Sequence, residues 1–211
     1  LPAERELSAK LGVNRVTVRR ALRLLSMQGL LVRRQGDGTY IAEPKIERQA
    51  DRLVPFTKGM RRRGYTPGAR VIIFEVRPLD VTAAKELRLP PASQVYYIER
   101  LRLINGEPAM LERLTVPVHS FPSLERFDLS LRSLYEVMET EYGVAIARAR
   151  QSLEPVIATE YEAELLAIEP GAPLMLERRL AFDRDGKPVE RGRDLYRGDR
   201  FRFVTEIAPM E

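Results

Sequence analysis

The fold of the N-terminal part of the chain is decided by the stretch LPAERELSAKLGVNRVTVRRALRLLSMQGLLVRRQGDGTYI (residues 1–41). Pro2 suits a helix start, Glu4 favours the positive end of the helix dipole, and Gly12 can end the helix. Asn14 can cap a second helix that ends near Gly29. Two helices joined by a short glycine-containing turn predict a helix-turn-helix.

The second helix has two distinct faces. One face carries an apolar stripe with the spacing of a buried surface, formed by Val18, Ala21, Leu22 and Leu25. Another face carries a row of arginines at positions 15, 19 and 23, spaced four residues apart. A solvated helix face would explain the row alone, but its position after a cap and a turn favours a helix that reads DNA bases.

Two β-prone runs follow, residues 30–34 and 39–42, and they flank the turn sequence QGDG. This pattern predicts a hairpin. A hairpin directly after a helix-turn-helix forms a wing, which lies near the DNA backbone or the minor groove.

The distribution of charge also separates this segment from the rest. Residues 1–42 hold eight basic and three acidic residues, whereas the remaining residues hold 27 of each. The whole net charge of +5 therefore lies in one fifth of the chain. Such asymmetry is expected when one module meets a polyanion and the other does not.

Residues 1–42 closely resemble the winged helix-turn-helix of the GntR superfamily of bacterial transcription regulators. That family places a further helix before the LPAEREL motif, so we expect one to precede Leu1. Asn14 stands where serine or threonine is common, and it can still cap the helix. The resemblance implies DNA contacts from the helices and the wing, at Arg5, Asn14, Arg15, Thr17, Arg19, Arg20, Gly36, Gly38 and Thr39.

The second module reads as an antiparallel sheet with helices. Residues 43–54 are polar and predict a linker, and the basic triplet at 61–63 is interpreted as solvated surface. Strands are expected at 70–78 and 144–158, hairpins around NGEP and RDG, and helices at 81–89, 133–143 and 159–168. Two helix–hairpin units resemble each other and pair Leu87 with Leu165 and Arg100 with Arg178. Either a duplication or chance would explain this likeness. If the sheet is built from two related halves, their helices should lie on one face of it.

Residues from about 50 to 209 resemble the UTRA domain of the HutC-type branch of GntR regulators, through ERLRLINGEPAMLERLTVP, SLYEVMETEYG, DGKPVE and YRGDRFRF. The resemblance implies a fold like that of chorismate lyase, used for effector binding and homodimerisation. We therefore predict an α+β protein: residues 1–42 form a winged helix-turn-helix that lacks its first helix, 43–54 a linker and 55–211 a UTRA domain.

An effector pocket needs a few polar groups in a largely apolar cleft. Arg100 and Arg102 alternate with leucines, so both side chains share one sheet face, where two guanidinium groups suit a phosphate or carboxylate. Cross-strand ion pairs on an exposed face are the alternative, and Arg148 and Arg150 form a weaker second candidate pair. Similarity to sugar-phosphate-sensing UTRA proteins implies a pocket of Arg100, Arg102, Glu112, Ser133, Tyr135, Glu190 and Tyr196.

Composition limits the other function classes. The chain has no cysteine, so disulfides and zinc–sulfur sites are excluded, and a cytoplasmic protein without cofactor or metal is expected. The single histidine, His119, lies in a proline-flanked loop without a supporting motif for a serine triad. No apolar run approaches the roughly 18 residues of a membrane span. We predict a dimeric, effector-responsive repressor; a chorismate-lyase-like enzyme and an architectural DNA-binding protein are the alternatives.

Overall fold

The computed structural model describes residues 1–27, 29–34, 38–41 and 44–208, and these form two compact units, 1–46 and 47–211. The first unit contains α1 (Glu4–Leu11), α2 (Arg15–Met27) and the antiparallel hairpin of β1 (Leu31–Arg34) and β2 (Gly38–Ile41). α1 ends at Gly12, whose φ of 65° lies in the left-handed region that glycine adopts without strain. The predicted helix–helix–hairpin order is therefore present.

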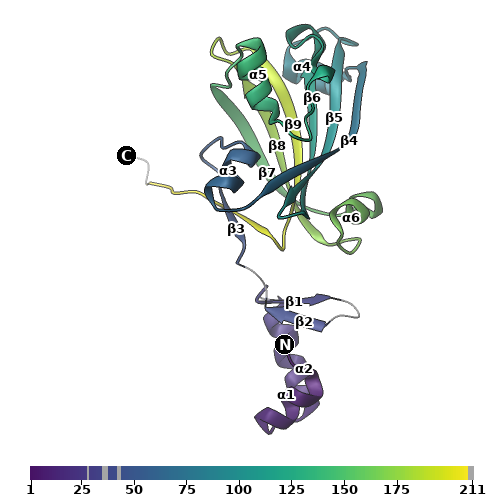
Figure 1. The fold of residues 1–211 in the computed structure, drawn as a ribbon, viewed down its shortest axis with the longest axis vertical. Coiled ribbons are helices and arrows are strands. Elements are labelled where there is room, and N and C mark those ends of the chain that lie inside the picture. The colour runs from purple at the N-terminus through teal and green to yellow at the C-terminus, as the bar shows by residue number, and fades with distance from the viewer. Residues whose placement is uncertain (28, 35–37, 42–43, 209–211) are drawn as a thin grey trace. The chain divides into compact units, whose positions relative to one another are not determined.

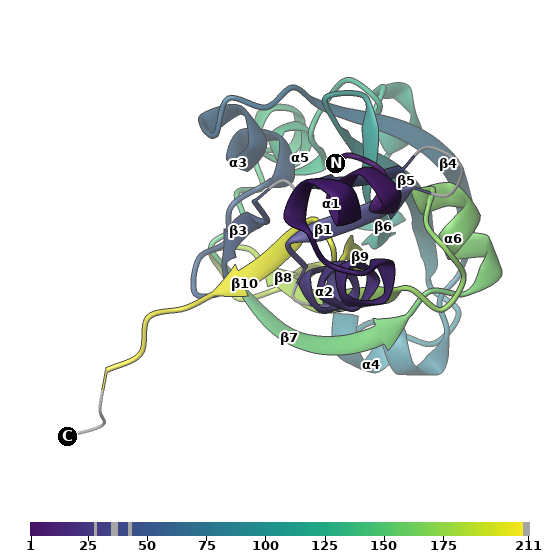
Figure 2. The same ribbon diagram turned by 90° about the horizontal axis from the view of Figure 1, so that it is seen from below.

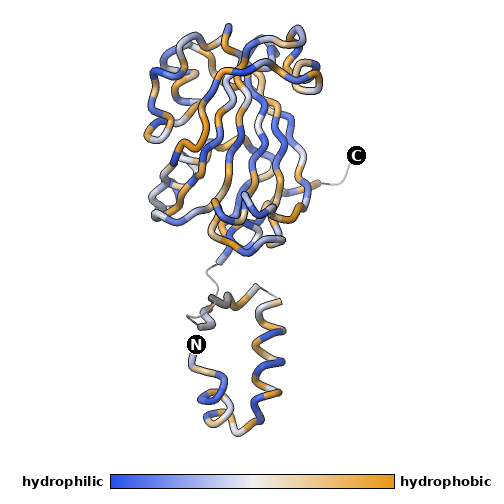
Figure 3. Tube along the Cα trace, turned by 90° about the vertical axis from the view of Figure 1, so that its right-hand side faces the viewer, coloured by the Kyte–Doolittle hydropathy of each residue, from blue (hydrophilic) through white to orange (hydrophobic). Residues whose placement is uncertain are grey.

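The apolar stripe of α2 is less buried than its spacing predicts. Val18 is buried, Leu22 is half-buried, and Ala21 and Leu25 are exposed. In Figure 3 hydrophobic and hydrophilic residues alternate along this helix. α1 has 8 residues and α2 has 13, so at about 1.5 Å per residue the shorter helix covers only part of the longer one.

The second unit is built on a six-stranded antiparallel sheet of order β4-β5-β6-β9-β8-β7 (Figure 1). Its strands are β4 (Pro67–Pro78), β5 (Gln94–Ile104), β6 (Glu107–Pro117), β7 (Arg148–Ile157), β8 (Pro173–Phe182) and β9 (Pro188–Arg197). A separate pair joins β3 (Ile46–Gln49) to β10 (Phe201–Val204). β3 lies inside the segment predicted to be a linker.

Helices lie on both faces of this sheet (Figure 2): the helices of the two helix–hairpin units share one face, as predicted, and a third helix covers the other. α5 (Leu134–Tyr142) packs on one face, against a cluster that includes Ile98 and Leu114. α4 (Val81–Leu87) and α6 (Glu160–Leu166) pack on the other, through clusters that include Leu180 and Leu111 respectively. We call the side of α5 the cavity face and the side of α4 and α6 the outer face.

Short elements complete the unit. α3 (Phe56–Arg62) begins before the basic triplet, and two 3-10 turns, η1 (Val118–Ser120) and η2 (Leu124–Arg126), follow β6. Sequence patterns did not predict α3, because its seven residues hold no strong cap and carry two arginines at the end. Within the described part of the chain, no helix is long and apolar enough to cross a membrane.

The two helix–hairpin units do form symmetric halves of the sheet, with β6 and β9 adjacent at its centre. The proposed pairing of Arg100 with Arg178 is nevertheless wrong. Arg100 lies opposite Glu112 on the cavity face, whereas Arg178 lies opposite Arg193 on the outer face. A shift of one residue in a strand exchanges the two faces, and the residue of β8 that enters the cavity is Arg179.

Candidate functional site

In the first unit, most residues predicted to contact DNA lie on the exposed surface of the helices. Asn14 caps α2 through Oδ1, which accepts hydrogen bonds from the Thr17 amide at 2.8 Å and the Thr17 hydroxyl at 3.0 Å. This cap satisfies a donor at the helix start and leaves Arg15 exposed in the first turn. Arg5 and Arg20 are exposed as well.

Among the described arginines that are predicted to contact DNA, Arg19 is paired with a carboxylate of the neighbouring helix. Its Nε and Nη2 donate to the carboxylate of Glu4 in α1, at 3.1 and 2.9 Å from Oε2. The pair links α1 to α2, but because it is exposed it contributes little to the free energy of folding. In the hairpin, Gly38 is exposed and Thr39 is half-buried, while Gly36 lies outside the described residues.

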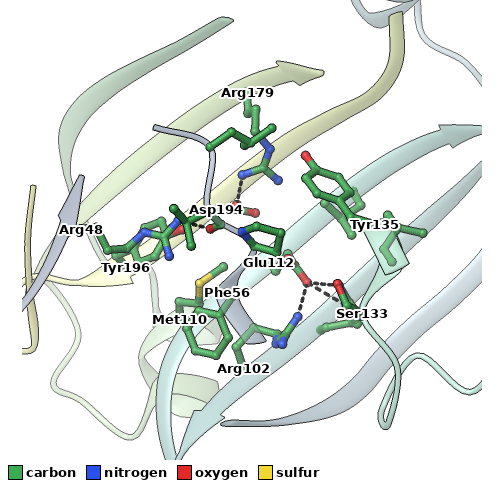
Figure 4. Close-up of a pocket in the computed structure, with 16 residues that line it drawn as sticks. Arg48, Phe56, Arg102, Met110, Glu112, Ser133, Tyr135, Arg179, Asp194 and Tyr196 are labelled. Atoms are coloured by element: carbon green, nitrogen blue, oxygen red, sulfur yellow. Dashed lines mark hydrogen bonds and ion pairs between the residues drawn. The ribbon is translucent and has the colours of Figure 1, made fainter. Parts of the chain in front are cut away.

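A cavity with about 450 Å³ of empty space, part of it open to solvent, lies on the cavity face of the second unit (Figure 4). Strands β5, β6, β9 and β8 supply its floor, and the start of α5 and residues 53–56 supply other walls. One row of the floor contains Arg100, Glu112, Asp194 and Glu177, each opposite the next across the sheet. The six predicted residues that line the cavity are Arg100, Arg102, Glu112, Ser133, Tyr135 and Tyr196.

Arg100 and Arg102 have different surroundings. Arg100 is 1% exposed; its Nε donates to Glu112 at 2.7 Å and its Nη1 to the Leu129 carbonyl at 2.9 Å. Arg102 donates from Nη1 to Glu112 at 3.3 Å and from Nη2 to the Thr57 hydroxyl at 2.8 Å. Its Nε is buried and has no hydrogen-bond partner among the described residues. Cross-strand ion pairs therefore exist, but on a buried face, and Arg102 keeps one free donor.

The second half of the floor is organised by Arg179, which was absent from the predicted pocket. Its Nη1 donates to Asp194 at 2.7 Å and Glu177 at 3.1 Å, and its Nε donates to Glu190 at 3.2 Å. Tyr135 donates its hydroxyl hydrogen to Glu190 at 2.6 Å, so Glu190 lies beside the cavity and orients Tyr135. Arg148 and Arg150, the second candidate pair, are exposed on the outer face.

Gly192 in β9 is the feature of the sequence that indicates the position of Arg179. A Cβ atom on Gly192 would lie 2.7 Å from Arg179 Nη2 and 2.6 Å from Glu190 Oε1. The guanidinium group of Arg179 therefore occupies the space that any other side chain at position 192 would fill.

The buried charges of the floor shift one another's pKa in opposite directions. Burial alone would raise the pKa of Glu112, but the charges of Arg100 and Arg102 lower it to about 2. Burial raises the pKa of Asp194 to about 8, with Glu112, Glu177 and Glu190 adding to the effect and Arg179 opposing it. At neutral pH Glu112 is ionised, whereas Asp194 holds a proton in most molecules.

Arg48 connects the cavity to the strand that follows the first unit. It belongs to β3, lines the cavity, and lies over the Tyr196 ring at 5.1 Å from the centroid. Its Nη2 donates to the Val54 carbonyl at 3.4 Å, and its buried Nε has no partner among the described residues.

Comparisons with known proteins agree with this architecture. Residues 1–41 match the model of bacterial regulatory proteins of the gntR family, and residues 62–202 match the UTRA domain. The chain is 37% identical to the HTH-type transcriptional repressor NagR of Bacillus subtilis over 97% of this chain and 84% of that protein. It is 32% identical to the mannosyl-D-glycerate transport/metabolism system repressor MngR of Escherichia coli, over 97% and 85%.

A solved structure gives the same result for the fold. The crystal structure of PhnF from Mycobacterium smegmatis aligns with 100% of this chain and 92% of its own, with a TM-score of 0.75 at 30% identity. GntR regulators bind DNA and small-molecule effectors. The chain belongs to the GntR family of bacterial transcription regulators, in the branch that carries a UTRA domain.

Proposed function

We propose that this chain is a homodimeric repressor that leaves its operator when a small oxyanion with hydroxyl groups fills the cavity. The observation that carries the ligand class is the Nε of Arg102, a donor on a 4% exposed arginine that no described residue uses. A buried donor without a partner is costly, and a carboxylate or phosphate oxygen would satisfy it.

The start of α5 supports an anion at the same place. Ser133 caps this nine-residue helix without a side-chain cap bond, and both Ser133 and the first two helical residues line the cavity. The first amides of a helix have no partner inside the helix, and the helix dipole favours negative charge there. Arg102 and these amides together form the anion end of the proposed site.

The opposite part of the floor is acidic and suits the rest of the ligand. Asp194 Oδ1 is a buried acceptor without a partner among the described residues, and Tyr135 and Tyr196 flank it. Hydroxyl groups can donate to such an acceptor and accept from a protonated carboxyl group. A hydroxylated acid or a sugar phosphate fits both ends. One relative is named as the repressor of a mannosyl-D-glycerate transport/metabolism system, and mannosyl-D-glycerate carries hydroxyl groups and a carboxylate.

The DNA-binding half of the proposal uses the exposed face of α2 and the wing. Arg15 and Thr17 occupy the first turn of the helix that enters the major groove, and Arg5 and Arg20 reach phosphates. Two such units, joined through the second domains, meet the two half-sites of a near-palindromic operator. We assign no catalytic role to the chain, and incubation with chorismate should yield no product.

Switching is proposed to run through Arg48 and the segment around Pro44. A ligand that accepts from Arg48 Nε holds β3 against the cavity, and β3 begins where the first unit ends. Because the coupling is reciprocal, operator DNA must weaken ligand binding by the same factor as the ligand weakens DNA binding. Arg48→Met should therefore reduce ligand-driven release of DNA more than it reduces ligand binding.

A panel of carboxylated and phosphorylated sugars tests the function. Each compound is added to the full chain, and thermal stabilisation and release of operator DNA are measured together. Arg102→Met should lose both responses and keep operator affinity, whereas the exposed α3 variant Arg62→Met should behave as the parent does. If neutral sugars act as strongly as the acids, or Arg102→Met responds normally, the oxyanion assignment is wrong.

A further inference from the structure

Three arginines lie side by side on the outer face of the sheet. Arg113 of β6 is opposite Arg193 of β9, and Arg193 is opposite Arg178 of β8. Residues directly opposite each other on adjacent strands share a face and have Cβ atoms about 5 Å apart, and like charges in such positions destabilise the sheet. The row therefore needs compensating negative charge.

The two outer members of the row are compensated. Arg113 donates to Glu99 at 2.9 Å and to Glu162 of α6 at 2.8 Å. Arg178 donates to Glu154 of β7 at 2.8 Å. Each of these arginines thus has a carboxylate of its own.

The central arginine differs from both neighbours. The side chain of Arg193 makes no hydrogen bond or ion pair with any residue that the structure describes, and its Nε is buried without a partner. Burial lowers the pKa of Arg193, and the charges of Arg178, Arg113 and Arg191 lower it further. Arg191, two residues earlier on the same face, is already paired with Glu86 of α4. The middle of the outer face therefore holds one arginine whose side chain has no partner among the described residues.

The row is partly exposed to solvent. Arg193 is half-buried and the side chain of Arg178 is 43% exposed. α6 packs toward Leu101 and Leu195, and α4 toward Val95 and Phe182, so the two helices cover different parts of the outer face. Guanidinium forks match carboxylate and phosphate oxygens in pairs, which chloride cannot do.

We propose that Arg193, assisted by Arg178, forms a second oxyanion site on the outer face, for the phosphate or carboxylate group of a small molecule. The site uses none of the residues of the cavity. Its existence does not depend on the function proposed for the cavity, because alternation along β9 places Arg193 and Asp194 on opposite faces.

Inorganic phosphate is the probe, and the Nε–H resonance of Arg193 in the full chain is the readout. Phosphate should shift this resonance in a saturable way, and sodium chloride of equal ionic strength should not. Arg193→Lys identifies the resonance by its loss. In Arg193→Leu the Nε–H resonance of Arg178 is the readout, and phosphate binding on this face should weaken by roughly tenfold, the value of one charge-assisted hydrogen bond. Arg102→Met removes the proposed anion end of the cavity, and the Arg193 shift should persist in it.

Three results would overturn the proposal. Equal shifts with chloride would mean general screening of charge. A shift that vanishes in Arg102→Met would mean that phosphate acts from the cavity. A shift that follows protein concentration and not phosphate would identify the occupant as a carboxylate of a second copy of the chain.

Discussion

Asp194→Asn should make the stability of the second unit less dependent on pH. Asp194 is 1% exposed, and its pKa of about 8 lies far above the value of about 4 for an unfolded aspartate. A carboxyl group whose pKa is raised by folding stabilises the fold fully below the unfolded pKa. This stabilisation is lost as the pH rises from about 4 to about 8. Asparagine keeps the shape of the protonated acid and does not titrate.

The size of the effect follows from the two pKa values. Between pH 5 and pH 7 the unfolded aspartate is ionised and the folded one is mostly protonated, so stability falls by about 1.4 kcal/mol per pH unit. The parent should therefore lose about 3 kcal/mol over this range that the variant does not lose. Glu112, whose pKa is lowered to about 2, contributes only below about pH 4.5 and leaves this window undisturbed.

Urea denaturation of the parent and the variant at pH 5, 6 and 7 measures the difference. Asp199→Asn is the matched control, because burial raises the pKa of Asp199 but the hydrogen bonds and charge of Arg197, a backbone hydrogen bond and the charge of Arg200 together lower it. Its stabilisation is present above the unfolded pKa and is lost only at lower pH, so the control should keep the slope of the parent between pH 5 and 7. Parallel curves for Asp194→Asn and the parent would show that the Asp194 carboxyl is ionised in the fold, and the account of the cavity charges would fail.

Three further substitutions test other parts of the structure. Asn14→Ala removes the cap of α2 and should cost about 1 kcal/mol, measured as roughly fivefold faster hydrogen exchange at the Thr17 amide; unchanged exchange would mean that the cap is not formed in solution. Arg15→Ala should reduce discrimination between operator and mutated operator by roughly 1–3 kcal/mol, whereas equal loss on all DNA would mark a phosphate contact. Gly192→Ala should cost roughly 1–3 kcal/mol in urea denaturation, because its Cβ would displace Arg179; wild-type stability would show that Arg179 has room to move.

The regular elements could be predicted from the sequence because their signals are local. Asn14 and Gly12 mark helix ends by their own chemistry, and NGEP marks the turn between β5 and β6, where Gly106 has a φ of 83°. Strand alternation also placed Arg100 and Arg102 together on one face. The conformation or facing of each of these residues is set by its neighbours along the chain, and these can be read directly from the sequence.

Arg179 could not be found in this way because its position depends on register. The sequence ERRLAF contains two adjacent arginines, and the internal likeness of the halves favoured Arg178. The true face depends on how β8 pairs with β9, and a slip of one residue exchanges the two arginines. Gly192 held the missing information, since a glycine inside a strand indicates close approach of another group. The contribution of Arg48 was hidden for a related reason, because β3 pairs with β10, which lies some 150 residues away in the chain.

β9 is the element through which the sites of the second unit can influence one another. Its alternation places Asp194 and Tyr196 in the cavity and Arg193 on the outer face, so a ligand on either side acts on the same strand. Tyr196 in turn contacts Arg48 of β3, the strand at which the first unit ends. Strands within a close-packed sheet shift together, and coupling between two ligands is reciprocal. An anion bound at Arg193 that altered affinity for the cavity ligand must therefore have its own affinity altered by the same factor.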